Sequence, residues 1–443
     1  MRRDTRAAML RLSALVGERR LFENEGYRRL WIARLLSATP VNAVVYAMLI
    51  LVVDQTGKNF FSSLFVAAYI APSALLGTVS GVVVDRMPKG VVLAVSNLAR
   101  AALCVLLAAS TGNVLTIYVI AVAFAVASQL SGPAEHAALP EIVEANELTA
   151  ANSLNNFGGL ISQVVGLMIL PVVFLKTVGA EALAIVCAVM FAASAFEFML
   201  VPKIGGAVSQ IPLSIEEARE RFAEAWSRLT QDAVCYSSVV MVVLASTASL
   251  VVVTLLPRYS TQVLSVHTEN AIFIVTPAAA GIWLALRFVG RVAGRYAPSL
   301  TLGLSFGALV GGITALAFVP ALSALISDAN PLGLFAPGPL SDTSARIIIT
   351  GLLAAGLAFA YTFLNIVARS VVNERIPQDM QGRVFAAQTV LINLASIPPI
   401  LLAGVLADAL SVTAVFFVVG VVCGLLALFY TARNIAAPAR VAY

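Results

Sequence analysis

Long apolar runs recur along the whole chain and are separated by short, mostly basic loops. A helix needs about 20 apolar residues to cross the hydrocarbon core of a bilayer. The predicted spans are residues 31–53, 60–84, 91–110, 114–133, 152–174, 179–201, 233–256, 270–290, 299–325, 346–369, 384–407 and 411–431. The runs are continuous and do not alternate between polar and apolar positions, which excludes a membrane barrel. The pattern predicts an all-α membrane protein with twelve transmembrane helices.

Composition supports a lipid environment for most of the chain. Hydrophobic residues make up 60% of the 443 residues, and charged residues only 12%. A soluble domain has about 25% charged residues. So few charges cannot cover a water-facing surface of this size, whereas a lipid-facing surface does not need them.

The basic residues are distributed unevenly between the loops. With both termini on one side, 22 of the 28 Lys and Arg residues fall in the tails and in or around the loops of that side. The opposite side holds only Lys58, Lys176, Arg258 and Arg346. Loops rich in Lys and Arg stay in the cytoplasm, so we expect both termini to be cytoplasmic.

The loop at residues 202–232 divides the predicted spans into two sets of six. Within it, residues 212–232 place charged and apolar side chains at helical spacing, which predicts an amphipathic helix at the interface. The expected organisation is a cytoplasmic tail (1–30), an N-terminal half (31–201), this linker (202–232), a C-terminal half (233–431) and a second tail (432–443). Many transporters consist of two repeated halves of this kind, and their substrate site lies near the membrane midplane between the halves.

The loop after the second predicted span reads Gly81-x-x-x-Asp85-Arg86-x-x-Lys89. Gly81 allows close helix packing, Asp85 can place its carboxylate at a helix N-terminus, and the basic residues can anchor at headgroups. This pattern resembles the signature of the major facilitator superfamily between its second and third helices. The resemblance implies a cytoplasmic gate; a basic anchor loop with no switching role is the alternative. In the second half, Arg295 belongs to the matching stretch at residues 290–298, where Gly294 replaces the Asp, and Arg383 belongs to a separate second-half stretch at Val371–Phe385.

Two further stretches, residues 22–37 and 132–154, are similar to the multidrug, macrolide and siderophore exporter branch of that superfamily. Their second-half counterpart runs from Val371 to Phe385 and continues at Gly404-Val-Leu-Ala-Asp408. Residues 65–70 are similar to the related lysophospholipid transporters. Those transporters carry Asp beside Asn in helix 1, where this chain has Val41-Asn42. Drug–proton antiporters carry an Arg in helix 4, where this chain has Ser128-Gln129. The sequence therefore leaves both the exporter branch and the lysophospholipid transporters as alternatives.

Few ionisable residues lie inside the predicted spans, and such residues are functional candidates by default. Arg100 is expected either to pair with an acid or to bind an anionic substrate. Glu197 could neutralise Arg100 or Arg34, or take up a proton as the coupling residue. Arg287 is either a headgroup anchor or a substrate contact. Snorkelling to the interface is enough to explain Arg34.

Uncharged polar residues near the predicted midplane are the other candidates for substrate contacts. They are Asn42, Tyr46, Gln129, Asn155, Gln163, Tyr361, Asn365 and Gln388. Each could instead hydrogen-bond a neighbouring helix, a contact worth about 0.6 kcal/mol in membrane proteins. As a set they occur on spans 1, 4, 5, 10 and 11, which line the cavity in the proteins that this chain resembles. A cavity with few charges suits an amphipathic substrate better than a sugar.

Motifs of enzymes and cofactor sites are absent from the sequence. No GxSxG, HExxH or GKS motif occurs, and the four cysteines have no metal-binding spacing. The Arg-rich tail leads into a span without a nucleic-acid-binding module. We therefore expect no enzyme activity, cofactor, metal or nucleic-acid partner.

The sequence favours a monomeric transporter of the bacterial inner membrane that works by alternating access. The first expectation is export of a small amphipathic or hydrophobic compound, driven by a cation gradient. The alternative is a lysophospholipid flippase, in which case membrane lipid is also the substrate. A scaffold that no longer transports is the third possibility.

Overall fold

A computed structural model describes residues 19–84, 87–144, 147–201, 223–224, 226–227, 229–266, 276–292, 296–329 and 341–436. All regular elements in these segments are helices. Most of the predicted linker at 202–232 and most of both tails lie outside the described residues.

The chain divides into two compact units. The N-terminal unit comprises residues 1–55 and 75–215, and the C-terminal unit comprises residues 56–74 and 216–443. The division into halves at 31–201 and 233–431 remains a prediction. One helix, α4 (Asn59–Val84), begins in the C-terminal unit and ends in the N-terminal unit.

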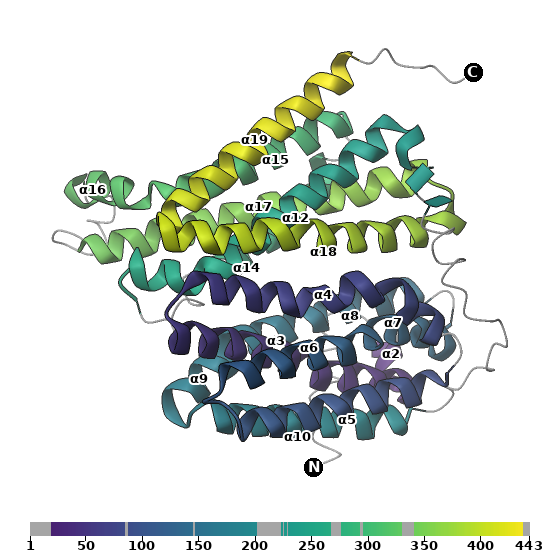
Figure 1. Cartoon of the computed structure of the whole chain (residues 1–443). Coiled ribbons are helices and arrows are strands. Elements are labelled where there is room, and N and C mark those ends of the chain that lie inside the picture. Colours follow the sequence, from purple (N-terminus) through teal and green to yellow (C-terminus); the bar gives the residue numbers. More distant parts are fainter. Residues whose placement is uncertain are drawn as a thin grey trace, which may run out of the picture. The chain divides into compact units, whose positions relative to one another are not determined.

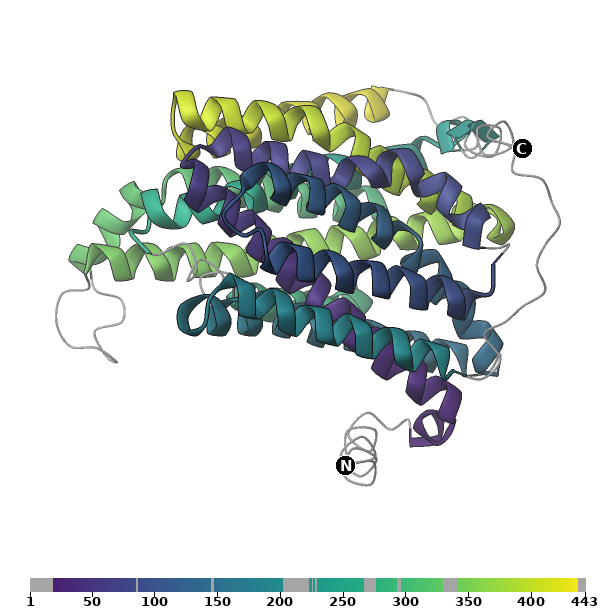
Figure 2. The same cartoon turned by 60° about the horizontal axis from the view of Figure 1, so that its bottom comes forward.

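The described residues of the N-terminal unit form nine further helical elements, several of them labelled in Figure 1. They are α2 (Arg19–Glu23), α3 (Glu25–Thr56), α5 (Lys89–Ala108), α6 (Val114–Gln129), α7 (Ser131–Ile142), α8 (Leu148–Val164), η1 (Val165–Ile169), α9 (Leu170–Thr177) and α10 (Ala180–Met199). Helix α10 packs along α5, as the second view also shows (Figure 2).

Where the C-terminal unit is described, it contains seven more long or medium helices. They are α12 (Ala233–Gln262), α14 (Pro277–Val292), α15 (Pro298–Ala317), α16 (Val319–Ala329), α17 (Asp342–Arg375), α18 (Gln378–Ala409) and α19 (Val412–Ala436). Helix α17 packs against α14 and α15, and α12 packs against α18.

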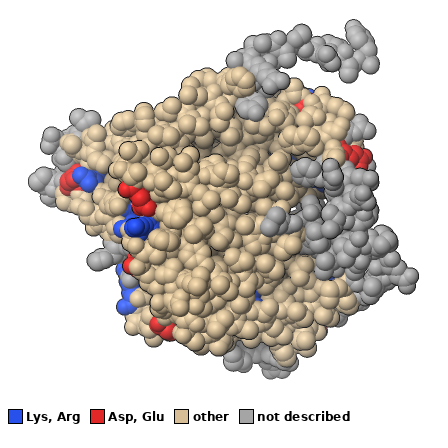
Figure 3. Space-filling model, viewed as in Figure 1, with Lys and Arg blue, Asp and Glu red and all other residues tan. Residues whose placement is uncertain are grey.

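The helices confirm an all-α protein that crosses the membrane many times. Ten of them are long and apolar enough to span a bilayer, and two shorter apolar helices, Asn59–Ala74 and Pro277–Val289, lie where the second and eighth spans were predicted. Each of the twelve predicted spans overlaps one or more helices of the described residues. On the face drawn in Figure 3, charged side chains are few and lie toward its edges, so the described surface between them is uncharged.

Three predicted spans are interrupted rather than continuous. The fourth is divided between α6 and α7, and the ninth between α15 and α16. The fifth contains a single π-helical turn at Val165–Ile169 between α8 and α9. Such π-turns inside helices occur frequently at functional sites. Here the turn includes Gly166, where an added Cβ would lie 2.3 Å from the carbonyl oxygen of Thr39, so only glycine permits this approach of η1 to α3.

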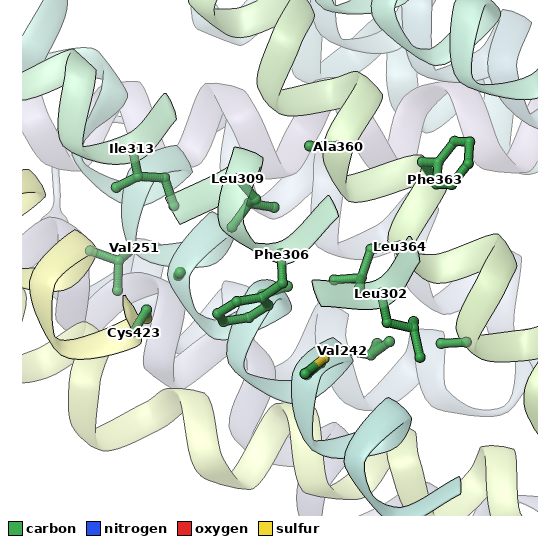
Figure 4. Close-up of a cluster of buried hydrophobic side chains, with 14 of the residues drawn as sticks. Val242, Val251, Leu302, Phe306, Leu309, Ile313, Ala360, Phe363, Leu364 and Cys423 are labelled. Carbon is green, nitrogen blue, oxygen red and sulfur yellow. The ribbon is translucent and has the colours of Figure 1, made fainter. Parts of the chain in front are cut away.

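A large cluster of buried apolar side chains forms the core of the C-terminal unit (Figure 4). It joins α12, α15, α17 and α19 through Val242, Phe306, Leu364 and Cys423. Helices α14 and α17 approach so closely that a Cβ on Gly281 would lie 1.9 Å from the carbonyl oxygen of Ala355. In lipid there is no apolar burial to gain from helix association, so close packing of this kind holds the helices together.

Asp232 fixes the start of α12. Its Oδ1 accepts hydrogen bonds from the backbone N–H groups of Val234 (2.9 Å) and Cys235 (3.0 Å), and its Oδ2 accepts one from Arg375 (3.0 Å). Partial burial raises the pKa of this carboxyl, but the backbone and guanidinium hydrogen bonds outweigh burial, and the net pKa is lowered. The capping contribution is therefore complete above the pKa of the unfolded chain, about 3.9, and is lost as the pH falls through the lower folded value.

We expect Asp232→Ala to destabilise the detergent-purified protein by about 1 kcal/mol, since it removes an N-cap. Asp232→Asn keeps a capping oxygen and loses only an exposed ion pair, so its cost should be smaller. Thermal unfolding at neutral pH measures both. Equal losses in the two variants would show that the ion pair, and not the cap, stabilises this end of α12.

Candidate functional site

Arg100 lies in the interior of the N-terminal unit. Its side chain extends from α5, and the residue is only 2% exposed. The guanidinium donates to the hydroxyl of Ser37 on α3 (3.0 Å), contacts the hydroxyl of Ser131 at the start of α7, and lies over the ring of Phe191 on α10 (5.7 Å to the ring centre). Four elements of this unit therefore meet around one arginine.

The N-terminal unit also contains an ion pair between Arg34 and Glu135. The Nε atom of Arg34 on α3 is 3.5 Å from Oε2 of Glu135 on α7. The two side chains are 22% and 15% exposed, and the positive charge of Arg100 also acts on the Glu135 carboxyl. We call Arg34, Arg100 and Glu135, with Ser37 and Ser131, the charged cluster. It carries two positive charges and one negative charge when all its members are ionised.

Glu135 was missed in the sequence because the fourth span was predicted to end at residue 133. Glu135 therefore fell in the loop that was expected after the span. In the structure Pro133 occupies the first turn of α7, where a missing N–H and a fixed φ are tolerated. Two sequence features could have identified Glu135 as a partner of the arginines. They are the shortage of acids near Arg34 and Arg100 and the apolar spacing that continues through Ala134, Ala138 and Leu139.

Glu197, the predicted coupling residue, has a different partner from those considered. Its Oε2 accepts a hydrogen bond from Arg29 (3.2 Å), and Arg29 also pairs with Glu25 (2.8 Å). Arg29 lies near the beginning of α3, and Glu197 lies in the last turn of α10. Glu197 therefore joins two helix ends and takes no part in the charged cluster.

The uncharged candidates of the N-terminal unit have mixed environments. Tyr46 and Asn155 are buried, and the Tyr46 hydroxyl and the Asn155 Oδ1 have no hydrogen-bond partner among the described residues. The amide of half-buried Asn42 donates to the carbonyl oxygen of Ala38 (2.9 Å), which is one turn earlier in its own helix. Gln129 is half-buried and Gln163 is exposed.

A cavity of about 280 Å³ lies within the C-terminal unit. Residues of α12, α14, α15, α17 and α19 line it, and nearly all its wall is aliphatic or aromatic. Its hydroxyl-bearing residues are Ser249, Tyr259, Thr350 and Tyr361. Tyr259 donates to the carbonyl oxygen of Leu316 (3.0 Å), and the Tyr361 hydroxyl lies 3.1 Å from that of Ser246, so both tyrosines already have polar partners. We call this the apolar cavity.

Of the four candidates predicted in the C-terminal unit, Tyr361 lines the apolar cavity. The amide of Asn365 donates to the carbonyl oxygen of Tyr361 (2.9 Å), one turn earlier in α17. Gln388 on α18 is half-buried. Arg287 on α14 is exposed, as is Trp283 one turn before it, which fits the headgroup-anchor alternative.

The predicted gate is described only in part. Lys89 forms an ion pair with Glu141 of α7, within the N-terminal unit. Arg383 forms an exposed ion pair with Glu224 (2.7 Å). Asp85, Arg86 and Arg295 lie outside the described residues, and for Gly81 only the helical backbone is described.

The two units thus hold different chemistry. The charged cluster can change its net charge if Glu135 takes up a proton, whereas the apolar cavity can hold a hydrophobic group. Among the described residues, no group of three or more His, Cys, Asp or Glu side chains could hold a metal ion.

Solved structures of similar fold are membrane transporters. A mutant of the nucleoside transporter NupG superposes with a TM-score of 0.72 at 11% identity, covering 92% of this chain and 99% of that one. The peptide transporter POT in complex with sulfate gives 0.66 at 13% identity, covering 93% and 94%. At such low identity the likeness shows the fold alone.

The sequence comparisons agree with this fold. No curated protein matches the chain. The sequence profile described as the Major Facilitator Superfamily matches residues 30–398, which is most of the chain. A match of this extent, on a many-span helical protein with transporter-like architecture, shows that the chain belongs to the major facilitator superfamily.

Proposed function

We propose that this transporter exports a small amphipathic or hydrophobic compound by alternating access. The observation that carries the proposal is the apolar cavity of the C-terminal unit. A hydrophobic group that enters it leaves water, which favours binding by about 25 cal/mol for each Å² of apolar surface removed. A sugar or another polyhydroxyl compound would lose its hydrogen bonds to water there and gain few in return.

Coupling to a proton gradient is the second part of the proposal, and it rests on the charged cluster. Protonation of Glu135 would remove the charge that faces Arg34 and Arg100 and leave two arginines without a counter-ion. That imbalance changes the relative energy of conformations that bury or expose the cluster. Glu197 is a weaker candidate because its partner is Arg29 near a helix end.

The orientation of this transport also belongs to the proposal. The excess of basic residues in the tails and in the loops on their side supports cytoplasmic termini in a bacterial inner membrane. Export then moves the compound from the side of the termini to the opposite side.

A substrate panel in reconstituted vesicles tests the function directly. We expect a proton gradient to drive accumulation of amphipathic drug-like, macrolide-like or siderophore-like compounds, while a nucleoside and a dipeptide are not moved. Transport of lysophospholipid alone would replace the exporter by the lipid-transport alternative. Movement of none of these compounds would contradict both.

Filling the apolar cavity should weaken substrate binding. Ala354 lines the cavity on α17, and Ala354→Phe would place a ring in it. Leu352, two residues earlier, is 68% exposed, so Leu352→Phe makes a matched control on an outward face. We expect Ala354→Phe to raise KM about tenfold with the control unchanged, since one buried ring displaces contacts worth about 1.4 kcal/mol or more. Vesicle transport kinetics measure both, and equal behaviour of the two variants would remove the cavity from the substrate path.

Neutralising Glu135 should uncouple transport from the proton gradient. We expect Glu135→Gln to abolish gradient-driven accumulation but to retain exchange of substrate across the membrane, since the variant cannot change its charge. Glu197→Gln should keep gradient-driven accumulation. Loss of the acid leaves half-buried Arg34 and buried Arg100 without a counter-ion. The folded fraction is therefore checked by size-exclusion chromatography, and Glu135→Asp should restore coupling. Full coupling in Glu135→Gln would contradict its role.

A further inference from the structure

Asp408 stands at the end of α18 and caps the beginning of α4. Its Oδ1 accepts hydrogen bonds from the backbone N–H of Asn59 (2.7 Å) and from the side-chain amide of the same residue (2.8 Å). Its Oδ2 accepts a third from the backbone N–H of Phe60 (2.9 Å). The first N–H groups of a helix have no partner within it, so a carboxylate here satisfies two of them and also faces the positive end of the helix dipole.

The two helices also touch directly one turn inside this cap. A Cβ added to Gly404 of α18 would lie 2.4 Å from the Ser63 hydroxyl oxygen, 2.6 Å from the Ser63 Cβ and 3.0 Å from the Asn59 carbonyl oxygen. Ser63 is fully buried. Small residues at such a contact let two backbones approach, so the cap and the packing depend on each other.

Helix α4 is the element that both units share. Its residues 59–74 are grouped with the C-terminal unit, whereas residues 75–84 are grouped with the N-terminal unit, and the helix is continuous from Asn59 to Val84. The Asp408 contact itself lies within the C-terminal unit. It holds there the first part of a helix whose second part belongs to the other unit.

We propose that Asp408 and Gly404 form a latch that holds α4 on α18 in one conformation of the transport cycle and releases it in the other. The contact between Asp408 and Asn59 is separated from each terminus by one predicted span. It therefore lies on the side of the membrane opposite both termini. The sequence pattern supports this role, because the spacing Gly404-x-x-x-Asp408 repeats that of Gly81-x-x-x-Asp85. The Gly81 pattern ends α4 on the side of the termini, where its resemblance implies a gate. The latch is the counterpart of that gate on the opposite side.

The contact is suited to reversible opening. Asp408 is exposed to solvent at the end of its helix, so water can replace the protein groups on both sides when the helices separate. Exposed polar contacts contribute modestly because of that competition. A latch of this strength biases a conformational equilibrium without trapping the protein in one state.

The latch rests on the proposed alternating-access function, but it can be tested without a substrate. The probe is Ser63→Cys in a background in which the four native cysteines are replaced, reacted with a water-soluble maleimide in lipid nanodiscs. The introduced thiol is covered by α18 when the latch is closed. Adding Asp408→Ala should raise its labelling rate about fivefold, the effect expected for loss of one helix cap. Gly404→Val, which forces the helices apart by its volume, should do the same.

Asn113→Ala is the matched control, because Asn113 also caps a helix, accepting from the N–H of Thr116 at the start of α6 within the N-terminal unit alone. It should leave the labelling rate of the Ser63→Cys probe unchanged. An unchanged rate in both Asp408→Ala and Gly404→Val would overturn the latch, whatever the vesicles transport. A raised rate in both, with no transport of any compound in the panel, would keep the latch and contradict the export function.

Discussion

The bilayer imposes the constraint on which the rest of this structure depends. Within hydrocarbon, each backbone N–H and C=O must find its partner inside the protein, and a helix is the element that satisfies them within one segment. The ten long apolar helices and two shorter ones among the described residues follow from this requirement. Because lipid is as apolar as the side chains, close packing holds the helices together, and glycines such as those at 166, 281 and 404 allow close approaches between helices.

The same constraint governs the charges. An arginine at the level of Arg100 is costly in a bilayer unless polar groups surround it, and Ser37, Asn97 and Ser131 supply those groups. The cluster of Arg34, Arg100 and Glu135 concentrates ionised groups in the N-terminal unit. The cavity of the C-terminal unit is almost free of them. The two units therefore separate the ionised groups from the largely apolar surface of the cavity.

Helix α4 is divided between the two compact units. It carries the signature glycine near one end and meets Asp408 at the other, and its two parts belong to different compact units. Rocking of two halves requires some contacts to break on one side of the membrane while others form on the opposite side. Polar contacts at exposed helix ends are suited to this exchange, since water replaces whatever partner is lost.

The sequence by itself determined the helical class, the approximate places of the apolar spans and the superfamily signature, because each depends on residues close together in the chain. Apolar run length reports the solvent, and the spacing of Gly81, Asp85 and Lys89 is a local pattern. The interruption of the fourth span was not predicted, since the span was expected to end at residue 133 and only packing shows that the helix resumes. Only the tertiary structure decided which charges meet. It paired Arg34 with Glu135 and Arg29 with Glu197, and it brought Asp408 to Asn59 across 349 positions of sequence. Such pairings depend on how helices pack, and no periodicity within a single helix encodes them.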